Sequence, residues 1–398
     1  MRKLLILFLF IPAVSIAQNV NQKVSAEDSL KSVKALDFFN KGLVDYPDNA
    51  EYYFERGRAK ITLKDFNGAL ADLNKAISLN YNLEIAYVDR GRLKDQLNYF
   101  NEAIADYDQA IMIKPTYAAY YNRGLANFSL NNFSAAVTDY GNAIPFDSKN
   151  GDLYYNRALA KAITNDKKGA LADYNQAVLL NPNNEQAYLN KANIELSLSD
   201  IKAAVVDYTK VIDINPGNIE AYANRSVIRL NKKEFAAAIS DINKILAADP
   251  KNLLSIYNRA LANDQLGKNK EAIADYSLYL TTNNDDAMAL YRRGNIYLKL
   301  INYKAAVADY DKSLALFSKN AQAYFNRAYC KRYLNNYSGA IEDYTEAIAL
   351  DPRNSDAYNN RGFVKHLMKN DVAACPDFKK AAQMGNKAAI ENSINMCR

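Results

Sequence analysis

The sequence predicts an all-α fold in which ten helical hairpins follow one another along the chain. Words such as AYYNRG, LYYNRA and AYFNRA recur, and the cationic residue within them returns every 34 residues, or 33 once. Within each period, apolar residues recur at i, i+3, i+4 and i+7, which is the spacing of amphipathic helices. A period this regular is typical of repeat architectures. The ten cationic positions are Arg56, Arg90, Arg123, Arg157, Lys191, Arg225, Arg259, Arg293, Arg327 and Arg361.

Each period holds two helices. In residues 151–184 the segments GDLYYNRALAKAIT and KKGALADYNQAVLL both carry the helical spacing, with a polar break near Asp166 and Lys167. The pair Asn181-Pro182 is expected to end the second helix and to place proline in the first turn of the next one, because proline has no N–H to donate. Pro145 falls within a second helix and predicts a kinked or shortened helix there.

Small residues are expected where two helices approach closely. In residues 84–116 these are Gly91, Ala103 and Ala110, and large residues such as Tyr87 and Tyr107 stand between them. A single hairpin cannot bury both of its apolar faces, so neighbouring hairpins are expected to stack and to share one continuous core.

These positions resemble the pattern of the tetratricopeptide repeat family. Unit 151–184 matches through Tyr154, Ala158, Ala170, Tyr174, Ala177 and Pro182, and the other units match in register with departures at Ile256, Leu290 and Asn269. The resemblance implies a helical-hairpin solenoid, a right-handed superhelix of about 22 helices. The ten units are expected at residues 50–83, 84–116, 117–150, 151–184, 185–218, 219–252, 253–286, 287–320, 321–354 and 355–388.

The first 17 residues, MRKLLILFLFIPAVSIA, are expected to be a secretory signal peptide. Arg2 and Lys3 precede a short apolar run, and Ser15 and Ala17 are the small residues of a cleavage site. The alternative is a short N-terminal anchor that stays uncleaved. After cleavage we expect no transmembrane segment, and a periplasmic, outer-membrane-associated or secreted protein.

Both ends of the array are expected to be capped. Residues 18–49 predict a degenerate N-terminal capping repeat, because Ala35, Leu36 and Phe39 match later repeats at the same 34-residue offset. Residues 387–398 predict a C-terminal capping helix after a turn at Gly385-Asn386.

The three cysteines are predicted to play different roles. Cys375 and Cys397 each lie 11 residues from Asn386, so an antiparallel hairpin places them opposite one another and predicts a disulfide in an exported protein. Cys330 occupies a close-packed first-helix position and is predicted to be a buried free thiol.

Each cationic position has an acidic residue 16 positions later. A row of acid/base groups is one interpretation of this pattern. The favoured one is a ladder of Arg–Asp pairs between first and second helices, because a catalytic site needs one special constellation and not ten alike. The ten acidic residues are Asp72, Asp106, Asp139, Asp173, Asp207, Asp241, Asp275, Asp309, Asp343 and Asp377.

The residues just before the cation are candidates for partner binding. Asparagine recurs there although it forms helices poorly, and the family resemblance implies that first helices line a concave groove. An amide there could grip an extended peptide, and a tyrosine could anchor it. The alternatives are an amide bonded to the adjacent helix and a tyrosine packed in the core. The candidate groove residues are Tyr121, Asn122, Tyr155, Asn156, Asn190, Asn224, Tyr257, Asn258, Tyr291, Asn326 and Asn360.

Catalysis, metal binding and nucleic-acid binding are not expected. The chain has one histidine, His366, and no cysteine pair with zinc spacing or glycine-rich phosphate loop. The formal net charge is only +6, without a run of five like charges. No lysine precedes the asparagine, so the carboxylate clamp of co-chaperone members is not expected either.

The sequence therefore favours a non-enzymatic protein without cofactors. We expect a scaffold, adaptor or assembly factor of the cell envelope that binds a segment of a protein or peptide partner in its groove. The alternative is a carbohydrate- or peptidoglycan-associated binding protein that uses the groove tyrosines.

Overall fold

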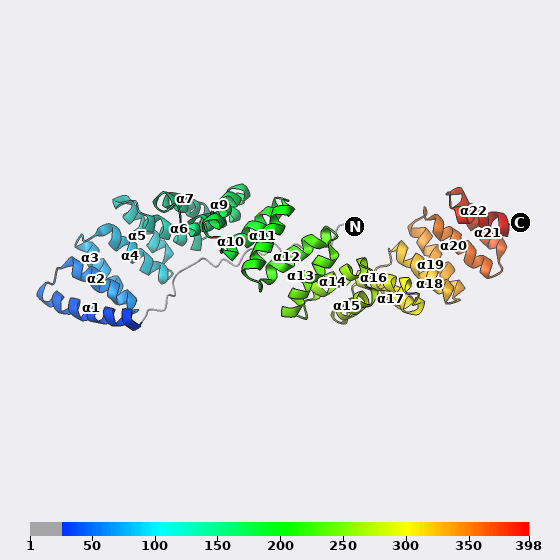
Figure 1. The fold of residues 1–398 in the computed structure, drawn as a ribbon, viewed down its shortest axis with the longest axis horizontal. Helices are drawn as coiled ribbons and strands as arrows, with labels where there is room; N and C mark the ends of the chain where they lie inside the picture. Colours follow the sequence, from blue (N-terminus) through cyan, green and yellow to red (C-terminus); the bar gives the residue numbers. More distant parts are fainter. Residues whose placement is uncertain (1–25, 398) are drawn as a thin grey trace. The chain divides into compact units, whose positions relative to one another are not determined.

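The computed structural model describes residues 26–397, so the expected signal peptide lies outside the described residues. Within this range the fold is an all-α helical-repeat solenoid of 22 α-helices and one short 3₁₀ helix, and no strand occurs among these residues (Figure 1). None of the described helices combines the length and the apolar character that a membrane span requires.

Helices alternate between a first and a second helix of each repeat. The first helices are α2 (Ala50–Thr62), α4 (Leu83–Gln96), α6 (Tyr117–Ser129), α8 (Gly151–Ile163), α10 (Glu185–Ser197), α12 (Ile219–Asn231), α14 (Leu253–Gln265), α16 (Ala287–Lys299), α18 (Ala321–Tyr333) and α20 (Ser355–Leu367). The second helices are α3 (Phe66–Ser78), α5 (Phe100–Ile113), α7 (Phe133–Ala143), α9 (Lys167–Leu180), α11 (Ile201–Ile214), α13 (Phe235–Ala248), α15 (Asn269–Thr282), α17 (Tyr303–Leu316), α19 (Tyr337–Leu350) and α21 (Asp371–Gln383). Helices α1 (Ala26–Asp45) and α22 (Lys387–Met396) stand at the two ends.

The chain divides into two compact units at Ala221 and Tyr222, inside α12. We call them the N-terminal unit and the C-terminal unit. Within each, the two helices of a repeat pack together and the second helix packs on the next first helix, as α8, α9 and α10 do in the N-terminal unit and α16, α17 and α18 in the C-terminal unit.

Repeated alanine and tyrosine positions form the core. In α5, Ala103, Tyr107 and Ala110 are fully buried, as the spacing predicts. Gly91 lies so close to this helix that an added Cβ would stand 2.6 Å from the ring of Tyr107. A larger residue at this position would force the ring to move, which explains the glycine.

Asparagine, and not proline, caps the start of most first helices. The expectation that Pro182 lies in the first turn of a helix is wrong, because α9 ends at Leu180 and α10 begins at Glu185. The Asn184 side chain accepts a hydrogen bond from the Ala187 N–H at 2.9 Å and so caps α10. Pro182 lies in the intervening turn.

Pro145 shortens its helix, as predicted. Helix α7 ends at Ala143, and Ile144–Phe146 continue as the 3₁₀ helix η1 with Pro145 near its start. Proline lacks the N–H that another α-helical turn would use.

The N-terminal end of the described chain is one long helix. Helix α1 spans 20 residues and packs on α2, where the ring of Phe39 lies 5.6 Å from that of Tyr52. The predicted capping repeat covers residues 18–49, and its first residues lie outside the described range.

The C-terminal cap contains the cross-linked cysteines. Helices α21 and α22 form a hairpin around Gly385, whose φ of +85° suits glycine. The structure joins Cys375 and Cys397 in a disulfide with Cα atoms 5.5 Å apart, the pairing that the sequence predicts. Cys330 is a buried free thiol.

Removing the cross-link is expected to loosen α22. The disulfide closes a separation of 22 residues, and the cross-link of such a loop contributes about 2–4 kcal/mol. In Cys397→Ser, we expect faster hydrogen exchange in α22 than in the unmodified protein, with α8 unchanged as the control. In the denatured, unreduced protein, a thiol reagent should modify Cys330 alone. Modification of all three cysteines before reduction would contradict the pairing.

Candidate functional site

The ten predicted charge pairs are all formed. Arg157 illustrates the geometry, because its Nε donates to Asp173 Oδ2 at 2.8 Å and its Nη2 to Oδ1 at 2.7 Å. The nine arginines hold their aspartates in this way, and Lys191 contacts Asp207 at 2.9 Å. A bidentate pair satisfies both buried carboxylate oxygens, so the ladder connects first and second helices.

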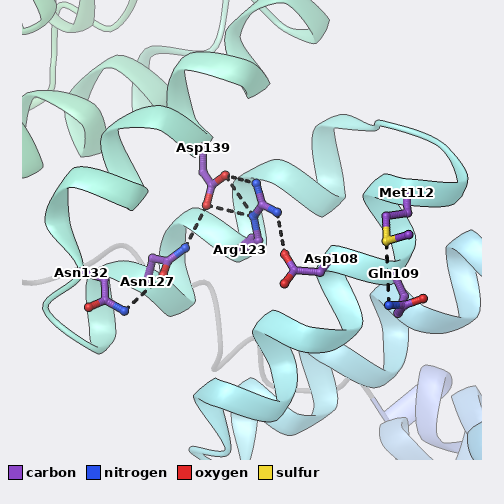
Figure 2. Close-up of polar contacts among 7 residues, drawn as sticks. All are labelled: Asp108, Gln109, Met112, Arg123, Asn127, Asn132 and Asp139. Atoms are coloured by element: carbon purple, nitrogen blue, oxygen red, sulfur yellow. Dashed lines mark hydrogen bonds and ion pairs between the residues drawn. The ribbon is translucent and has the colours of Figure 1, made fainter.

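A second donor usually joins each aspartate from one turn further along the first helix. In Figure 2, Asp139 accepts from Arg123 and from Asn127 Nδ2 at 3.0 Å, while Arg123 Nη1 also donates to Asp108 of the preceding repeat at 2.6 Å. The arginine thus also connects neighbouring repeats. The cations in the position of Asn127 that contact their aspartates are Lys60, Lys94, Lys161, Arg229, Lys331 and Lys365.

One repeat reverses this charge pattern. Glu195 stands where the second donor is expected, 3.6 Å from Lys191 and close to the buried Asp207. Burial raises the pKa of Glu195 to about 7, and the negative charge of Asp207 raises it too, against the lowering effect of Lys191. Two carboxylates therefore share one cation in the interior of this repeat.

The first helices of neighbouring repeats also contact one another within each unit. Helix α4 contacts α2 and α6, and α18 contacts α16 and α20. Polar side chains bridge them, as when Asn326 Nδ2 donates to Asn295 Oδ1 at 2.9 Å. We call the surface that the first helices line within each unit the first-helix face.

Four of the predicted groove residues are buried, which corrects their interpretation as exposed anchors. Tyr155, Asn156, Asn190 and Tyr257 are only 2–6% exposed. Asn190 Nδ2 donates to Tyr155 Oη at 3.3 Å, and Asn156 Nδ2 donates to Tyr121 Oη at the same distance. These amides bond to the adjacent first helix, and the tyrosine rings pack on the aromatic residue of the second helix.

The remaining candidates are half-buried. Asn326 accepts from Gln322 at 2.8 Å in addition to its contact with Asn295. The roles of all the half-buried candidates in partner binding stay predictions. The half-buried candidates are Tyr121, Asn122, Asn224, Asn258, Tyr291, Asn326 and Asn360.

Arg292 replaces the recurring asparagine and leaves polar atoms unsatisfied. Its Nε is buried without a hydrogen-bond partner among the described residues, and so are the hydroxyls of Tyr257 and Tyr276. Burial raises the pKa of Tyr257, and the nearby Arg292 guanidinium opposes this rise. In two other repeats, an asparagine satisfies the tyrosine equivalent to Tyr257.

The structure also reveals a group that sequence reasoning missed. Tyr303, Tyr329, Arg332, Tyr333 and Phe363 gather around the end of α18. Aligning the ten repeats by their cationic positions would have singled out Arg332 and Tyr333, because no other repeat carries arginine or tyrosine at those positions.

The buried Cys330 does not have the setting of a catalytic nucleophile. Burial raises the pKa of the Cys330 thiol to about 12, so it stays protonated. His366 Nδ1 lies 2.5 Å from Asp371 on the surface of α20. No group of three potential metal ligands occurs among residues 26–397.

Comparison with known families identifies the repeats. Tetratricopeptide repeat families match residues 50–83, 151–184, 185–218, 219–252 and 287–320, as well as 85–152, and a TPR repeat family matches 329–369. Together these matches cover more than half of the chain, and none is an enzyme family. No curated protein matches the sequence.

Several solved structures are similar over part of the chain. A structure of the MamA protein is 24% identical, covers 43% of this chain and 94% of its own, and has a TM-score of 0.40. YrrB, described as a TPR protein with an unusual peptide-binding site, is 21% identical over 46% and 95%, with a TM-score of 0.42. A tetratricopeptide repeat protein from Parabacteroides merdae is 19% identical over 64% and 98%, with a TM-score of 0.39.

Glu195 is expected to make stability depend on pH. Its pKa is raised from 4.5 to about 7 in the folded state, so the folded protein binds more protons than the unfolded chain between these values. Stability should therefore fall as pH rises through this window. Glu195→Lys restores the usual second cation and should gain on the order of 1–2 kcal/mol at pH 8.

Thermal unfolding at pH 5 and pH 8 tests this expectation. Relative to the unmodified protein, Glu195→Gln should be stabilised more at pH 8 than at pH 5. The exposed Glu342→Gln is the matched control and should show no such difference. Equal effects of Glu195→Gln at both pH values would contradict the assignment.

Proposed function

Because the chain belongs to the tetratricopeptide repeat family, whose members serve as protein-interaction scaffolds, we propose that it binds an extended segment of a partner protein on its first-helix face. In this role it is an adaptor or assembly factor of the cell envelope. The envelope location is proposed from residues 1–17, which have the composition of a secretory signal peptide.

One observation carries the proposal. Half-buried amides and aromatic rings occur on the first helices, whereas the charge ladder and the core tyrosines lie between the helices of each hairpin. Asn122, Asn258 and Asn360 keep part of their surface open to solvent. An amide offers a donor and an acceptor together, as an extended peptide backbone requires.

A protein partner is favoured over a carbohydrate. A sugar-binding surface would need a band of exposed tyrosines along the face. Tyr155 and Tyr257, which would belong to that band, are 6% and 3% exposed and pack inside the repeats. The half-buried asparagine amides of the first-helix face suit a peptide backbone instead.

Site-specific photo-crosslinking in intact cells tests the proposal. A photoreactive residue is placed at Asn122, Asn258 or Asn360 on first helices, and at the exposed Lys244, Lys312 or Glu346 on second helices as matched controls. We expect adducts with a common partner protein in the periplasmic fraction from the first-helix positions only. Adducts that form equally from the second-helix positions would contradict the proposed face.

A further inference from the structure

The most unusual surface of the C-terminal unit lies at the end of α18. Tyr329, Arg332 and Tyr333 come from its last turns, Tyr303 begins α17, and Phe363 comes from α20. We call these five residues the aromatic–arginine cluster. Tyr333 is 48% exposed, so the cluster opens to solvent.

The rings form a stacked platform. Those of Tyr303 and Tyr333 are nearly parallel, with centroids 4.8 Å apart and an interplanar angle of 12°. Tyr329 lies 4.9 Å from Tyr333, and its hydroxyl donates to the Tyr333 hydroxyl at 3.3 Å. The platform therefore consists of rings held in place by one another.

The Arg332 guanidinium lies among these rings. Its central carbon is 4.6 Å from the centroid of Tyr333, 5.0 Å from that of Tyr329 and 5.4 Å from that of Phe363. Cation–π contact does not use the N–H groups of a guanidinium, and of these groups Arg332 shares a hydrogen bond with Tyr333 and keeps the others for an acceptor.

Arg332 has no acidic partner in the part of the chain that the structure describes. The adjacent Lys331 contacts Asp343 at 2.9 Å, and Arg327 holds the other oxygen of that carboxylate. The Tyr344 hydroxyl, on the second helix behind, is buried without a hydrogen-bond partner. The cluster therefore holds a cation that the protein itself does not neutralise.

The repeat fold does not require these residues. The position of Arg332 is occupied by Ile61, Ala162 and Leu298 in other repeats, and that of Tyr333 by Thr62 and Ser129. Those repeats form the same helical hairpin with the same charge pair. The other repeats are thus an internal control for a structural role.

The two units also differ in charge. Residues 222–398 contain 26 Lys and Arg against 18 Asp and Glu, whereas residues 1–221 contain 24 against 26. The cluster therefore belongs to the unit with a net positive charge, and such a net charge favours the approach of an acidic ligand.

We propose that the aromatic–arginine cluster binds an acidic segment of the partner protein. An Asp or Glu carboxylate pairs with the N–H edge of Arg332, and an adjoining apolar or aromatic side chain packs on the exposed ring of Tyr333. Tyrosine and arginine are the residues that most often dominate the affinity of protein interfaces. This inference rests on the proposed function and adds the chemistry of the partner.

Fluorescence anisotropy with three labelled, amidated peptides tests the inference on the full-length protein. The probes are GGEFEGG, its uncharged counterpart GGQFQGG and the basic GGKFKGG. We expect GGEFEGG to bind at least about tenfold more tightly than GGQFQGG, because only the carboxylate forms an ion pair with Arg332.

Substitutions taken from the chain's own repeats locate the binding. Arg332→Leu and Tyr333→Ser introduce residues that other repeats tolerate, so both variants should fold, which circular dichroism verifies. Arg332→Leu should reduce the affinity for GGEFEGG to that for GGQFQGG, and Tyr333→Ser should weaken both. The exposed Arg353→Leu removes the same charge from a turn and should have no effect.

Three results would overturn the inference. These are equal binding of GGEFEGG and GGQFQGG, a preference for GGKFKGG, and unchanged binding by Arg332→Leu. The proposed function is tested separately, because photo-crosslinking detects a partner of any charge. A crosslinked partner whose capture is insensitive to Arg332→Leu would leave the scaffold function standing and remove the acidic-segment inference.

Discussion

A buried carboxylate on the second helix of every repeat is the constraint on which the rest of the structure depends. These ten aspartates are only 2–6% exposed. A charge removed from water to this extent is stable only when it is paired and hydrogen-bonded. In nine repeats the bidentate arginine of the first helix meets both requirements, and it thereby fixes the position of one helix on the other. Where the same arginine also reaches the preceding repeat, as Arg123 reaches Asp108, it helps to set the stacking of hairpins.

The Arg–Asp pair accounts for the charged residues that recur in every repeat. Charged residues that depart from the repeat pattern therefore need a separate explanation. Most repeats add a second donor to the aspartate, so Glu195, which adds a second carboxylate, leaves a surplus of negative charge inside one hairpin. Arg292 and Arg332 are cations that have no carboxylate partner among the described residues. Arg292 adjoins two buried hydroxyls, whereas Arg332 contacts the exposed ring of Tyr333. Both arginines are half-buried, and the exposed ring of Tyr333 beside Arg332 is what suits that cation to a partner.

Much of the fold could be predicted from the sequence, because the period fixes both helices of each repeat and the 16-residue offset between opposite charges. The cysteine pairing followed from equal distances to one turn. The burial of single groove residues could not be predicted in this way. Asn156 and Asn190 are buried against Tyr121 and Tyr155 of the preceding repeats, to whose hydroxyls they donate. These contacts depend on how the repeats stack. The aromatic–arginine cluster was not predicted, because the prediction rested on residues that the repeats share. Arg332 and Tyr333 occur at their positions in one repeat only.

A double-mutant cycle on Arg293 and Asp309 tests the central constraint most directly. This repeat has Tyr297 in place of a second cation, so the pair stands without another charge on the aspartate. Unfolding free energies are compared for Arg293→Leu, Asp309→Leu and the double variant. Each single change should cost about 3–5 kcal/mol because it leaves a buried charge unpaired, and the double change should cost much less than their sum. The exposed pair Asp37 and Lys41 in α1 is the matched control, expected to contribute about 0–1 kcal/mol. Single changes at Arg293 and Asp309 that cost no more than this control, with additive effects, would contradict the central role of the buried pair.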